Sequence, residues 1–314
     1  MPQSRPRRRS LRALAVGAAL VVSAGCSGTA EKPTAAVAPA KAPSKAPSKA
    51  PSKAPDTAGL AAPHELPPVT ALLLTPHLRD AQAQRKVAIA CMAARGYRYA
   101  PAPPPTSPAG TGEHPKPFGL ESTTPPTAAP TASPETPPEP GSPESTDAYA
   151  RALFGDEAKR VTVRGERLSV SRPGDGCLAE AETRILGDGR IRWLQVRILL
   201  FEAEEDARAD VEKDVAFRAV TTRWRECMER AKVKAQDPVQ VQRSLRSAEE
   251  RRTGPVAAAD LHCKAETKYL TTAYERLAAV QQRWLDGHPD IGRDWKKLSD
   301  RQEKAAGEVL GTRG

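Results

Sequence analysis

The chain has 314 residues, a formal net charge of +10 and a sequence pI of about 9.5, and only 4% of its residues are aromatic. Residues 1–25 carry five arginines and no acidic residue, and residues 26–69 carry five lysines and three acidic residues, which leaves residues 70–314 at about +3. Nucleic-acid binding needs a clustered basic surface on the folded domain, so this charge distribution argues against a nucleic-acid partner.

Residues 1–25 have the pattern of a bacterial export signal. The arginine-rich start is followed, from Ala13, by an apolar run of about a dozen residues that is too short to span a bilayer. The residues before Cys26, in VSAGC, resemble a lipobox in which Ser23 replaces the usual leucine. This resemblance implies a lipid on Cys26 and anchoring on the outer face of the cell membrane. The alternative is ordinary cleavage nearby with an unmodified Cys26. The RRRSLR run also resembles a twin-arginine signal, which leaves the export route open.

Residues 26–69 are predicted to form a disordered stalk. They contain KAPSKAPSKAPSKAP, a four-residue repeat from Lys41 to Pro55 with no side chains suited to a core. An extended polyproline conformation at about 3.1 Å per residue would give residues 27–68 a reach of roughly 130 Å. Such a stalk would hold a folded domain away from the membrane.

The first helix of the folded domain is expected within residues 70–100. Thr75 is suited to the N-cap, Pro76 to the first helical position and Gly96 to a left-handed C-cap. Residues 101–147 contain many proline, serine and threonine residues and almost no aliphatic ones, so we expect a disordered excursion that interrupts the domain.

Residues 148–312 are predicted to complete a mainly helical bundle with one small β-hairpin. The hairpin is expected around Gly165 and Glu166. The expected helices are a short one ending at Gly155, one ending at Gly187, a long tract over 191–235 broken near Asp214, a block after Gly254, and a last helix over 290–310. In the long tract, an apolar stripe of Ile191, Leu194, Ile198 and Phe201 is expected to face the core.

Four cysteines remain besides Cys26, and an even number in an exported chain indicates disulfides. Cys91 and Cys227 each precede a methionine near the end of a predicted helix, whereas Cys177 and Cys263 each begin a C-x-A-E run near the start of one. These contexts suggest a duplicated unit and predict the pairs Cys91–Cys177 and Cys227–Cys263. The domain is thus expected to be a disulfide-stapled helical bundle, with both methionines filling the core beside the bridges.

Several of these segments together resemble a family of exported proteins and lipoproteins from high-GC Gram-positive (actinobacterial) bacteria. The segments are CMAARGY, YARALFGD, DGCLAEAETRILGD, WRECM and AAADLHCKAE, within about 75–285 and outside the proline-rich excursion. The resemblance implies secretion and the two bridges, and it carries no activity. The sequence departs from the family pattern at Lys232 and Val233, where glycine and an aromatic residue are expected, which makes the helix cap after Cys227 doubtful.

The sequence contains no motif of a metalloprotease, a serine hydrolase, a dinucleotide-binding site or a P-loop, so we assign no catalytic residue, metal or cofactor. His262 beside Cys263 could form a nucleophile pair if the cysteine were free. Glu180 with Glu182, or Glu204 with Glu205, could serve a cell-wall glycosidase. The four tryptophans are expected in the core; a sugar-binding role would need them exposed: Trp193, Trp224, Trp284 and Trp295.

We therefore expect a membrane-anchored extracytoplasmic lipoprotein that acts as a non-enzymatic binding or accessory module at the cell envelope. Its expected partners are the membrane, through the lipid on Cys26, and an envelope protein or wall polymer. The alternative is a cell-wall hydrolase that uses a carboxylate pair. A solute receptor would need alternating strands and helices, which the sequence lacks.

Overall fold

The structure is a computed structural model that describes Leu60 and residues 65–104, 115–122 and 141–311. All of these residues belong to Lys53–Gly314, the second of two units into which the chain divides. The predicted signal over 1–25, Cys26 and most of the predicted stalk lie outside the described residues.

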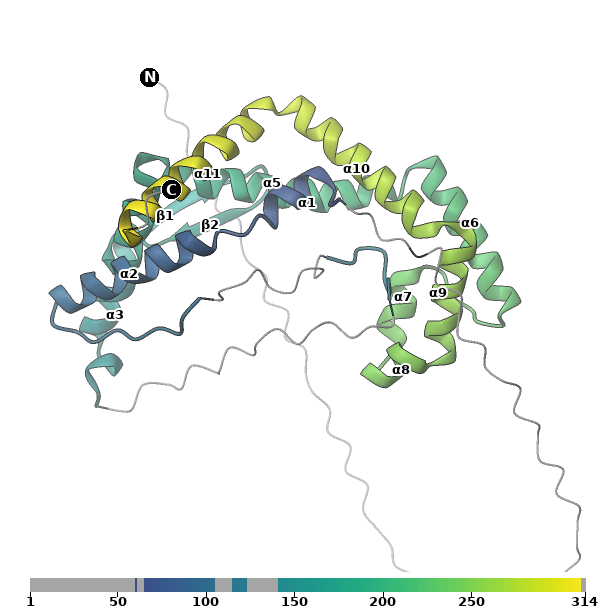
Figure 1. Cartoon of the computed structure of the whole chain (residues 1–314), viewed down its shortest axis with the longest axis horizontal. Coiled ribbons are helices and arrows are strands. Elements are labelled where there is room, and N and C mark those ends of the chain that lie inside the picture. The colour runs from purple at the N-terminus through teal and green to yellow at the C-terminus, as the bar shows by residue number, and fades with distance from the viewer. Residues whose placement is uncertain (1–59, 61–64, 105–114, 123–140, 312–314) are drawn as a thin grey trace, which may run out of the picture. The chain divides into compact units, whose positions relative to one another are not determined.

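The described part is mainly helical with one two-stranded hairpin, as the sequence predicts (Figure 1). The helices are α1 (Pro68–Leu73), α2 (Leu78–Ala94), α3 (Asp147–Phe154), α4 (Gly176–Leu186), α5 (Arg190–Val211), α6 (Val215–Arg230), α7 (Pro238–Ser244), α8 (Ala248–Thr253), α9 (Pro255–Thr267), α10 (Tyr269–Gly287) and α11 (Pro289–Leu310). The strands are β1 (Val161–Arg164) and β2 (Ser169–Arg172). None of the helices within the described ranges is long and apolar enough to cross a membrane.

Two sets of three helices follow the same order, which supports the duplication inferred from the cysteines. We call α2, α4 and α5 the first repeat, and α6, α9 and α10 the second repeat. In each repeat the first helix is bridged by a disulfide to the second, and a long third helix follows. The third helices α5 and α10 pack against each other, and α11 packs on α2 and α4 (Figure 1).

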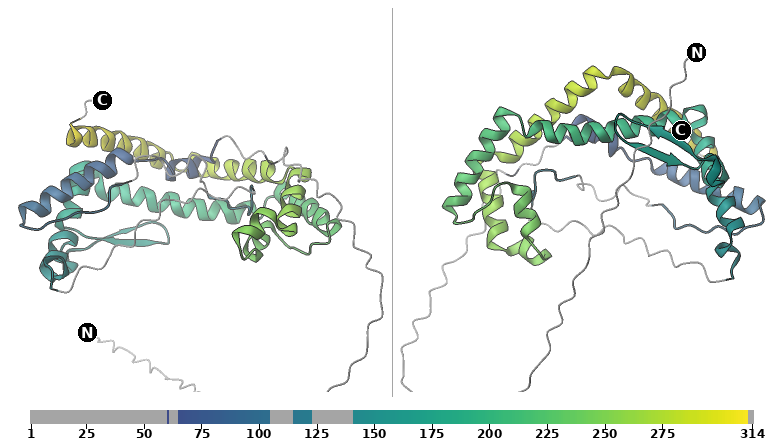
Figure 2. Two further views of the ribbon diagram at one scale, coloured as in Figure 1. Left: turned by 60° about the horizontal axis from the view of Figure 1, so that its bottom comes forward. Right: turned by 180° about the vertical axis from the view of Figure 1, so that it is seen from behind.

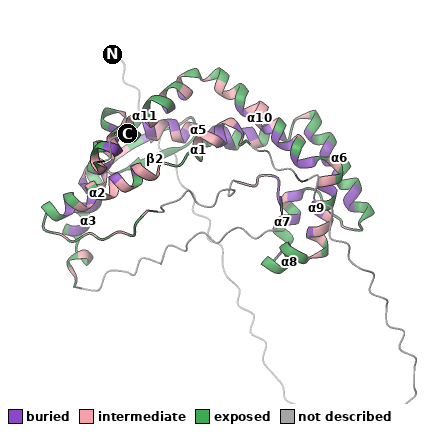
Figure 3. Ribbon diagram, in the orientation of Figure 1, coloured by how far each residue is buried: buried purple, intermediate pink, exposed green. Residues whose placement is uncertain are grey.

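Buried side chains line the faces where these helices meet (Figure 3). Met92 and Met228, the methionines beside Cys91 and Cys227, are both fully buried, which confirms that they are core fillers. Trp193, Leu200 and Trp295 form a core between α5 and α11, whereas Trp224, Tyr269 and Leu277 form another within the second repeat.

The β-hairpin lies against α5, where its two arrows can be followed in Figure 2. The strands pair antiparallel, with Val163 opposite Val170. The Glu202 carboxylate of α5 accepts hydrogen bonds from the backbone amides of Glu166, Arg167 and Leu168 in the turn. These amides would otherwise lack partners beside the helix, so Glu202 fixes the position of the turn.

The helix ends after the two Cys-Met pairs have the same geometry. Gly96 has φ of 81° and Lys232 has φ of 60°, both in the left-handed region. The amides of the next residues, Tyr97 and Val233, donate back to the carbonyls of Met92 and Met228 at 3.0 and 2.9 Å. The sequence made this cap doubtful after Cys227, because Lys232 and Val233 replace the glycine and the aromatic residue of the family pattern. The cap is nevertheless formed, with Lys232 in a conformation that glycine adopts more readily.

Two sequence-based boundaries are wrong. The stalk was expected to extend to residue 69, yet Leu60 packs against the core and Val69 is fully buried in α1. The amides of Val69 and Thr70 donate to Gln281 on α10, so α1 is held by a long-range contact. The next helix begins at Leu78 rather than at Thr75, whose hydroxyl donates instead to the carbonyl of Ala71.

The expectation that residues 101–147 lie wholly outside the core is also wrong. Within 115–122, Phe118, Leu120 and Glu121 are buried against the second repeat. Gly119 has φ of 85°, and a Cβ there would overlap the backbone of Pro238, so this close approach requires glycine. The segment contains one of only four phenylalanines in the chain, which was the available sequence signal.

The buried face of α5 differs from the expected stripe. Ile198 is buried, but Ile191 and Phe201 are 41% and 48% exposed. The face toward the core instead carries Trp193, Val196, Leu200, Ala203, Ala207 and Val211. Both faces of this helix are apolar near its start, so periodicity alone did not identify the core-facing one.

Candidate functional site

The structure contains the disulfides Cys91–Cys177 and Cys227–Cys263, the pairing expected from the repeated sequence contexts. The Cα atoms are 5.6 Å apart in both bridges. Cys91 and Cys227 lie in the C-terminal parts of α2 and α6. Cys177 lies at the start of α4, as expected, but the prediction that Cys263 lies near the start of a helix is wrong, because α9 begins at Pro255. Disulfides persist in oxidising compartments, so the bridges indicate an extracytoplasmic environment.

Residues of the resembling motifs gather around these bridges. Tyr149 and Leu153 of α3 pack beside Cys91 and Cys177. Gly155 and Gly176 have φ of 87° and 86°, and a Cβ on Gly176 would overlap the backbone of Gly155. Both glycines are therefore required for the close contact between the end of α3 and the start of α4.

A buried charged pair lies one helical turn from the second bridge, and the sequence reasoning missed it. Asp260 and Lys264 on α9 are fully buried, with Nζ of Lys264 2.9 Å from Oδ2 of Asp260. Trp224 Nε1 donates to Asp260, and Nζ of Lys264 also donates to the carbonyl of Leu120 at 2.6 Å. Burial raises the pKa of Asp260 and lowers that of Lys264, while their mutual attraction opposes both shifts. This pair holds the 115–122 segment against the second repeat.

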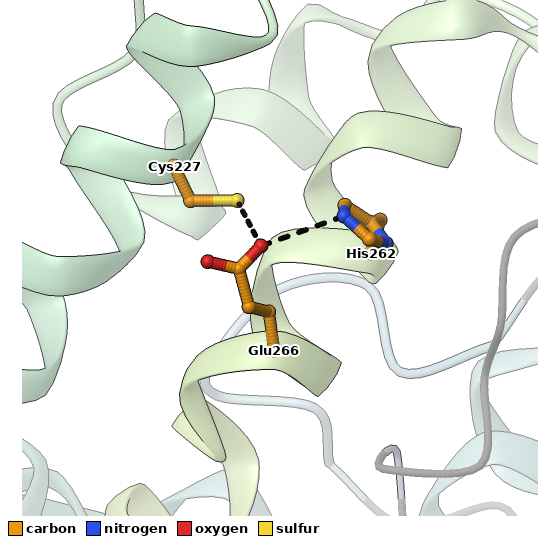
Figure 4. Close-up of side chains that lie close together, drawn as sticks. All are labelled: Cys227, His262 and Glu266. Atoms are coloured by element: carbon orange, nitrogen blue, oxygen red, sulfur yellow. Dashed lines mark hydrogen bonds and ion pairs between the residues drawn. The ribbon is translucent and has the colours of Figure 1, made fainter.

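The buried Cys227 and the exposed His262 and Glu266 lie close together in the second repeat (Figure 4). The Glu266 carboxylate is 3.5 Å from the Cys227 sulfur and 3.5 Å from Nε2 of His262, and it pairs with Arg230. The sulfur of Cys227 is bonded to Cys263, so neither cysteine supplies a thiolate. The trio is therefore not a metal centre in the oxidised protein, and His262 has no free thiol beside it.

The two carboxylate pairs suggested by the sequence are engaged in ion pairs. Glu182 is held by Arg172 at 2.9 Å and Arg190 at 2.7 Å. Glu180 lies on the other side of α4, 3.2 Å from the Cys91 sulfur. Glu204 and Glu205 both pair with Arg208, at 3.0 and 3.4 Å. Neither pair has two carboxylates facing one open space.

A cleft of about 400 Å³ opens between α2, α4 and α5, and we call it the first cleft. Its lining residues are His77, Asp80, Ala81, Gln84, Arg172, Glu182, Leu186, Arg190, Ile191, Trp193, Leu194 and Arg197. It adjoins a hollow of about 290 Å³ and shares Arg172, Glu182 and Arg190 with it. The volume is within the range of small-ligand sites, and the lining combines apolar walls with convergent charged groups.

Three arginines line the first cleft, and Arg172 and Arg190 both pair with Glu182. Arg197 has no acidic partner in the part of the chain that the structure describes. Its guanidinium carbon lies 5.9 Å from the centroid of the Trp193 ring. Burial, with a smaller contribution from the nearby charge of Arg172, lowers the pKa of Arg197. A guanidinium remains protonated in proteins. The cleft therefore holds a half-buried positive charge that an anionic ligand would neutralise.

Two further titratable groups from α2 and its N-cap line this cleft. The His77 ring packs 5.3 Å from Trp193 and 5.9 Å from Trp295, and its buried Nε2 atom has no hydrogen-bond partner among the described residues. Burial lowers the pKa of His77, which favours the neutral ring. Burial raises the pKa of Asp80, whose carboxylate accepts from Gln84 at 3.0 Å and Gln302 at 3.3 Å.

The tryptophans are mainly core residues, as expected. Trp193 stacks on Trp295 with ring centroids 4.6 Å apart, and Trp224 is fully buried. Trp284 is half-buried and stacks on His288. Trp193 also forms part of the wall of the first cleft, a role that no local sequence pattern indicated.

Comparisons of the chain with protein-family models, with curated proteins and with solved structures returned no match.

Proposed function

We propose that the protein is a lipid-anchored, extracytoplasmic binding module of the cell envelope that is not an enzyme, and that the first cleft is its ligand site. The export signal and the lipobox-like sequence at Cys26 support the anchor, and the two disulfides support the compartment.

The unpaired guanidinium of Arg197 is the observation that carries this proposal. Arg172 lines the same cleft, and its charge acts on Arg197 although it pairs with Glu182. A carboxylate fits the planar fork of a guanidinium and would remove the unfavourable proximity of the two cations. The exposed Ile191 and the neighbouring Leu194 offer apolar contact beside this charge.

The ligand class that fits best is a short acidic peptide of the cell wall. Such a peptide carries free carboxylates for Arg197 and small alkyl side chains for the apolar wall. The adjoining hollow, lined in part by Tyr99, Pro101 and Pro104, gives room for the chain to continue. A ligand of this kind is also available to a protein held at the outer face of the membrane.

Calorimetric titration of the full, oxidised chain with muropeptides, released from peptidoglycan by a muramidase, tests the proposal. We expect saturable binding that Arg197→Gln weakens about ten-fold or more, because hydrogen bonds between ions contribute about 1.5–3 kcal/mol. Arg184→Gln is the matched control, since Arg184 is exposed on α4 and does not line the cleft. Equal loss of affinity in both variants, or no binding, would contradict the assignment.

A second candidate function rests on Asp80 and Glu182, which line the same cleft. Burial raises the pKa of Asp80, as in a general acid, and Glu182 is held by two arginines. A wall hydrolase built on this pair would release reducing sugar or free amine from peptidoglycan. Release that Asp80→Asn abolishes would favour the hydrolase over the binding module.

A further inference from the structure

The internal repeat places a second hollow at the corresponding position of the second repeat. We call it the second cleft; it has a volume of about 600 Å³ and lies beside α6 and α7. Four residues that line the second cleft have counterparts in the hollow next to the first cleft. The two residues of each pair are separated from Cys91 and from Cys227, respectively, by the same number of residues. Two of these pairs lie on the helix before the cysteine: Ala81 and Phe217 are ten residues before it, and Arg85 and Thr221 are six residues before it. The other two pairs follow the cysteine: Pro101 and Asp237 are ten residues after it, and Ala102 and Pro238 are eleven residues after it.

The two hollows also share a backbone arrangement. In each repeat the chain passes the left-handed cap and then returns along its own helix. An arginine of the helix donates to a carbonyl of the returning segment in both cases: Arg85 to Pro101 and Arg225 to Gln236. The second cleft is therefore a repeated feature of the fold rather than an isolated surface depression.

The charges around the second cleft differ from those around its counterpart. Four arginines line it, from the end of α5 and from α6 and α7: Arg208, Arg218, Arg225 and Arg243. Two acidic residues, Glu212 and Asp237, also line it, and Asp237 is occupied in capping α7 through the amide of Gln240. The lining as a whole therefore carries an excess of positive charge.

Two of the four arginines are already engaged. Arg208 pairs with Glu204 and Glu205, and Arg225 donates to the backbone at Gln236. Arg218 and Arg243 have no acidic partner among residues 65–104, 115–122 and 141–311. They come from different helices, α6 and α7, and both line the same cleft. An anion with two charges and several acceptor oxygens would satisfy both guanidiniums together.

We propose that the second cleft binds a phosphate group of an extracytoplasmic ligand, with Arg218 and Arg243 as its principal contacts. Phosphate offers the oxygens and the double charge that two guanidiniums need, whereas one carboxylate offers a single charge. This site is independent of the first cleft, so the absence of muropeptide binding would not bear on it.

Calorimetric titration of the full, oxidised chain with pyrophosphate, with inorganic phosphate and with a poly(glycerol phosphate) chain tests this site. We expect binding that weakens at least ten-fold in the double variant Arg218→Gln/Arg243→Gln and that falls with rising salt. Tighter binding of pyrophosphate or inorganic phosphate than of the polymer would identify a phosphate monoester or free pyrophosphate. Tighter binding of the polymer would identify two neighbouring phosphodiesters, each with one charge, as the groups that the two arginines bind.

One control variant decides whether the cleft itself is responsible. Arg223→Gln removes an exposed arginine of α6 that does not line the cleft. It should bind pyrophosphate as the unchanged protein does. Arg218 and Arg243 are exposed, so the double variant should keep the melting temperature of the parent. If the double variant melts at a lower temperature, the two single variants provide the same binding test. Equal weakening by Arg223→Gln, or no phosphate binding at millimolar concentration, would overturn the proposal.

Discussion

The indole nitrogen of Trp224 donates a hydrogen bond to the carboxylate of Asp260, 3.0 Å away, in the interior of the second repeat. Each of these residues lies three positions before a bridged cysteine, Cys227 and Cys263. The hydrogen bond is therefore one helical turn from the disulfide and joins the same two helices, α6 and α9. Lys264 completes the arrangement by pairing with Asp260 and with the backbone of Leu120.

Removing both members of the Asp260–Lys264 pair should cost less stability than the two single substitutions added together. Lys264→Met leaves a fully buried carboxylate without its cation, which should lower the free energy of unfolding by about 3–5 kcal/mol. Asp260→Asn with Lys264→Met removes both charges and should cost clearly less than the sum of the single changes. Urea denaturation of the four proteins of this cycle measures the coupling, and additive losses would show that the pair is not coupled.

Lys232→Gly should stabilise the protein. Lys232 has φ of 60°, a conformation that costs a residue with a side chain about 1 kcal/mol relative to glycine. Its counterpart in the first repeat is already glycine, Gly96. The melting temperature should therefore rise in Lys232→Gly. Lys232→Ala is the control, because alanine removes the lysine side chain but keeps the backbone strain of the positive φ. An equal rise in melting temperature in both variants would contradict the explanation.

Acidification should weaken the packing of His77 between Trp193 and Trp295. Burial lowers the pKa of His77 in the folded state, whereas the unfolded value is about 6.5. The unfolded state therefore binds the proton more readily, and stability falls as the pH drops below about 6.5 toward the folded pKa. His77→Phe retains a ring and cannot protonate, so its stability relative to the parent should increase between pH 7 and pH 5. A constant difference over this range would contradict the assignment.

Glu202 should make the β-hairpin sensitive to acid. Burial alone would raise its pKa, but three backbone amides outweigh burial and the pKa of Glu202 is lowered. The stabilisation is present above the unfolded value of about 4.3 and is lost as the pH falls through the folded pKa. At pH 7, Glu202→Gln should cost about 2 kcal/mol through the loss of charged hydrogen bonds. Denaturation at pH 7 and pH 3 should show the cost shrinking, whereas the exposed Glu205→Gln should change little at either pH.

The features that could be predicted from the sequence are those with local physical causes. Gly155 and Gly187 end their helices where the sequence places them, and Asp214 caps α6 at the expected break. The cysteine pairing followed from the repeated local contexts. The chain break at Lys268, with φ of 54°, was not predicted, because lysine is not a usual left-handed residue.

The remaining features depend on long-range contacts that local patterns do not record. Leu120 and Lys264 are 144 residues apart in sequence, so the docking of 115–122 could not be inferred from a proline-rich composition. Arg197 resembles any other helical arginine in the sequence. Only the packing of α2, α4 and α5 shows that it lines a cleft without an acidic partner.

Arginine side-chain NMR provides the most direct test of the proposed ligand site. Muropeptides should be titrated into the full, oxidised and ¹⁵N-labelled chain while the Nε–Hε signals are followed. We expect the signals of Arg197 and Arg172 to shift with a common saturation curve, while that of the exposed Arg184 stays unchanged. Unchanged Arg197 and Arg172 signals, or equal shifts of all three, would contradict the assignment of the first cleft as the binding site.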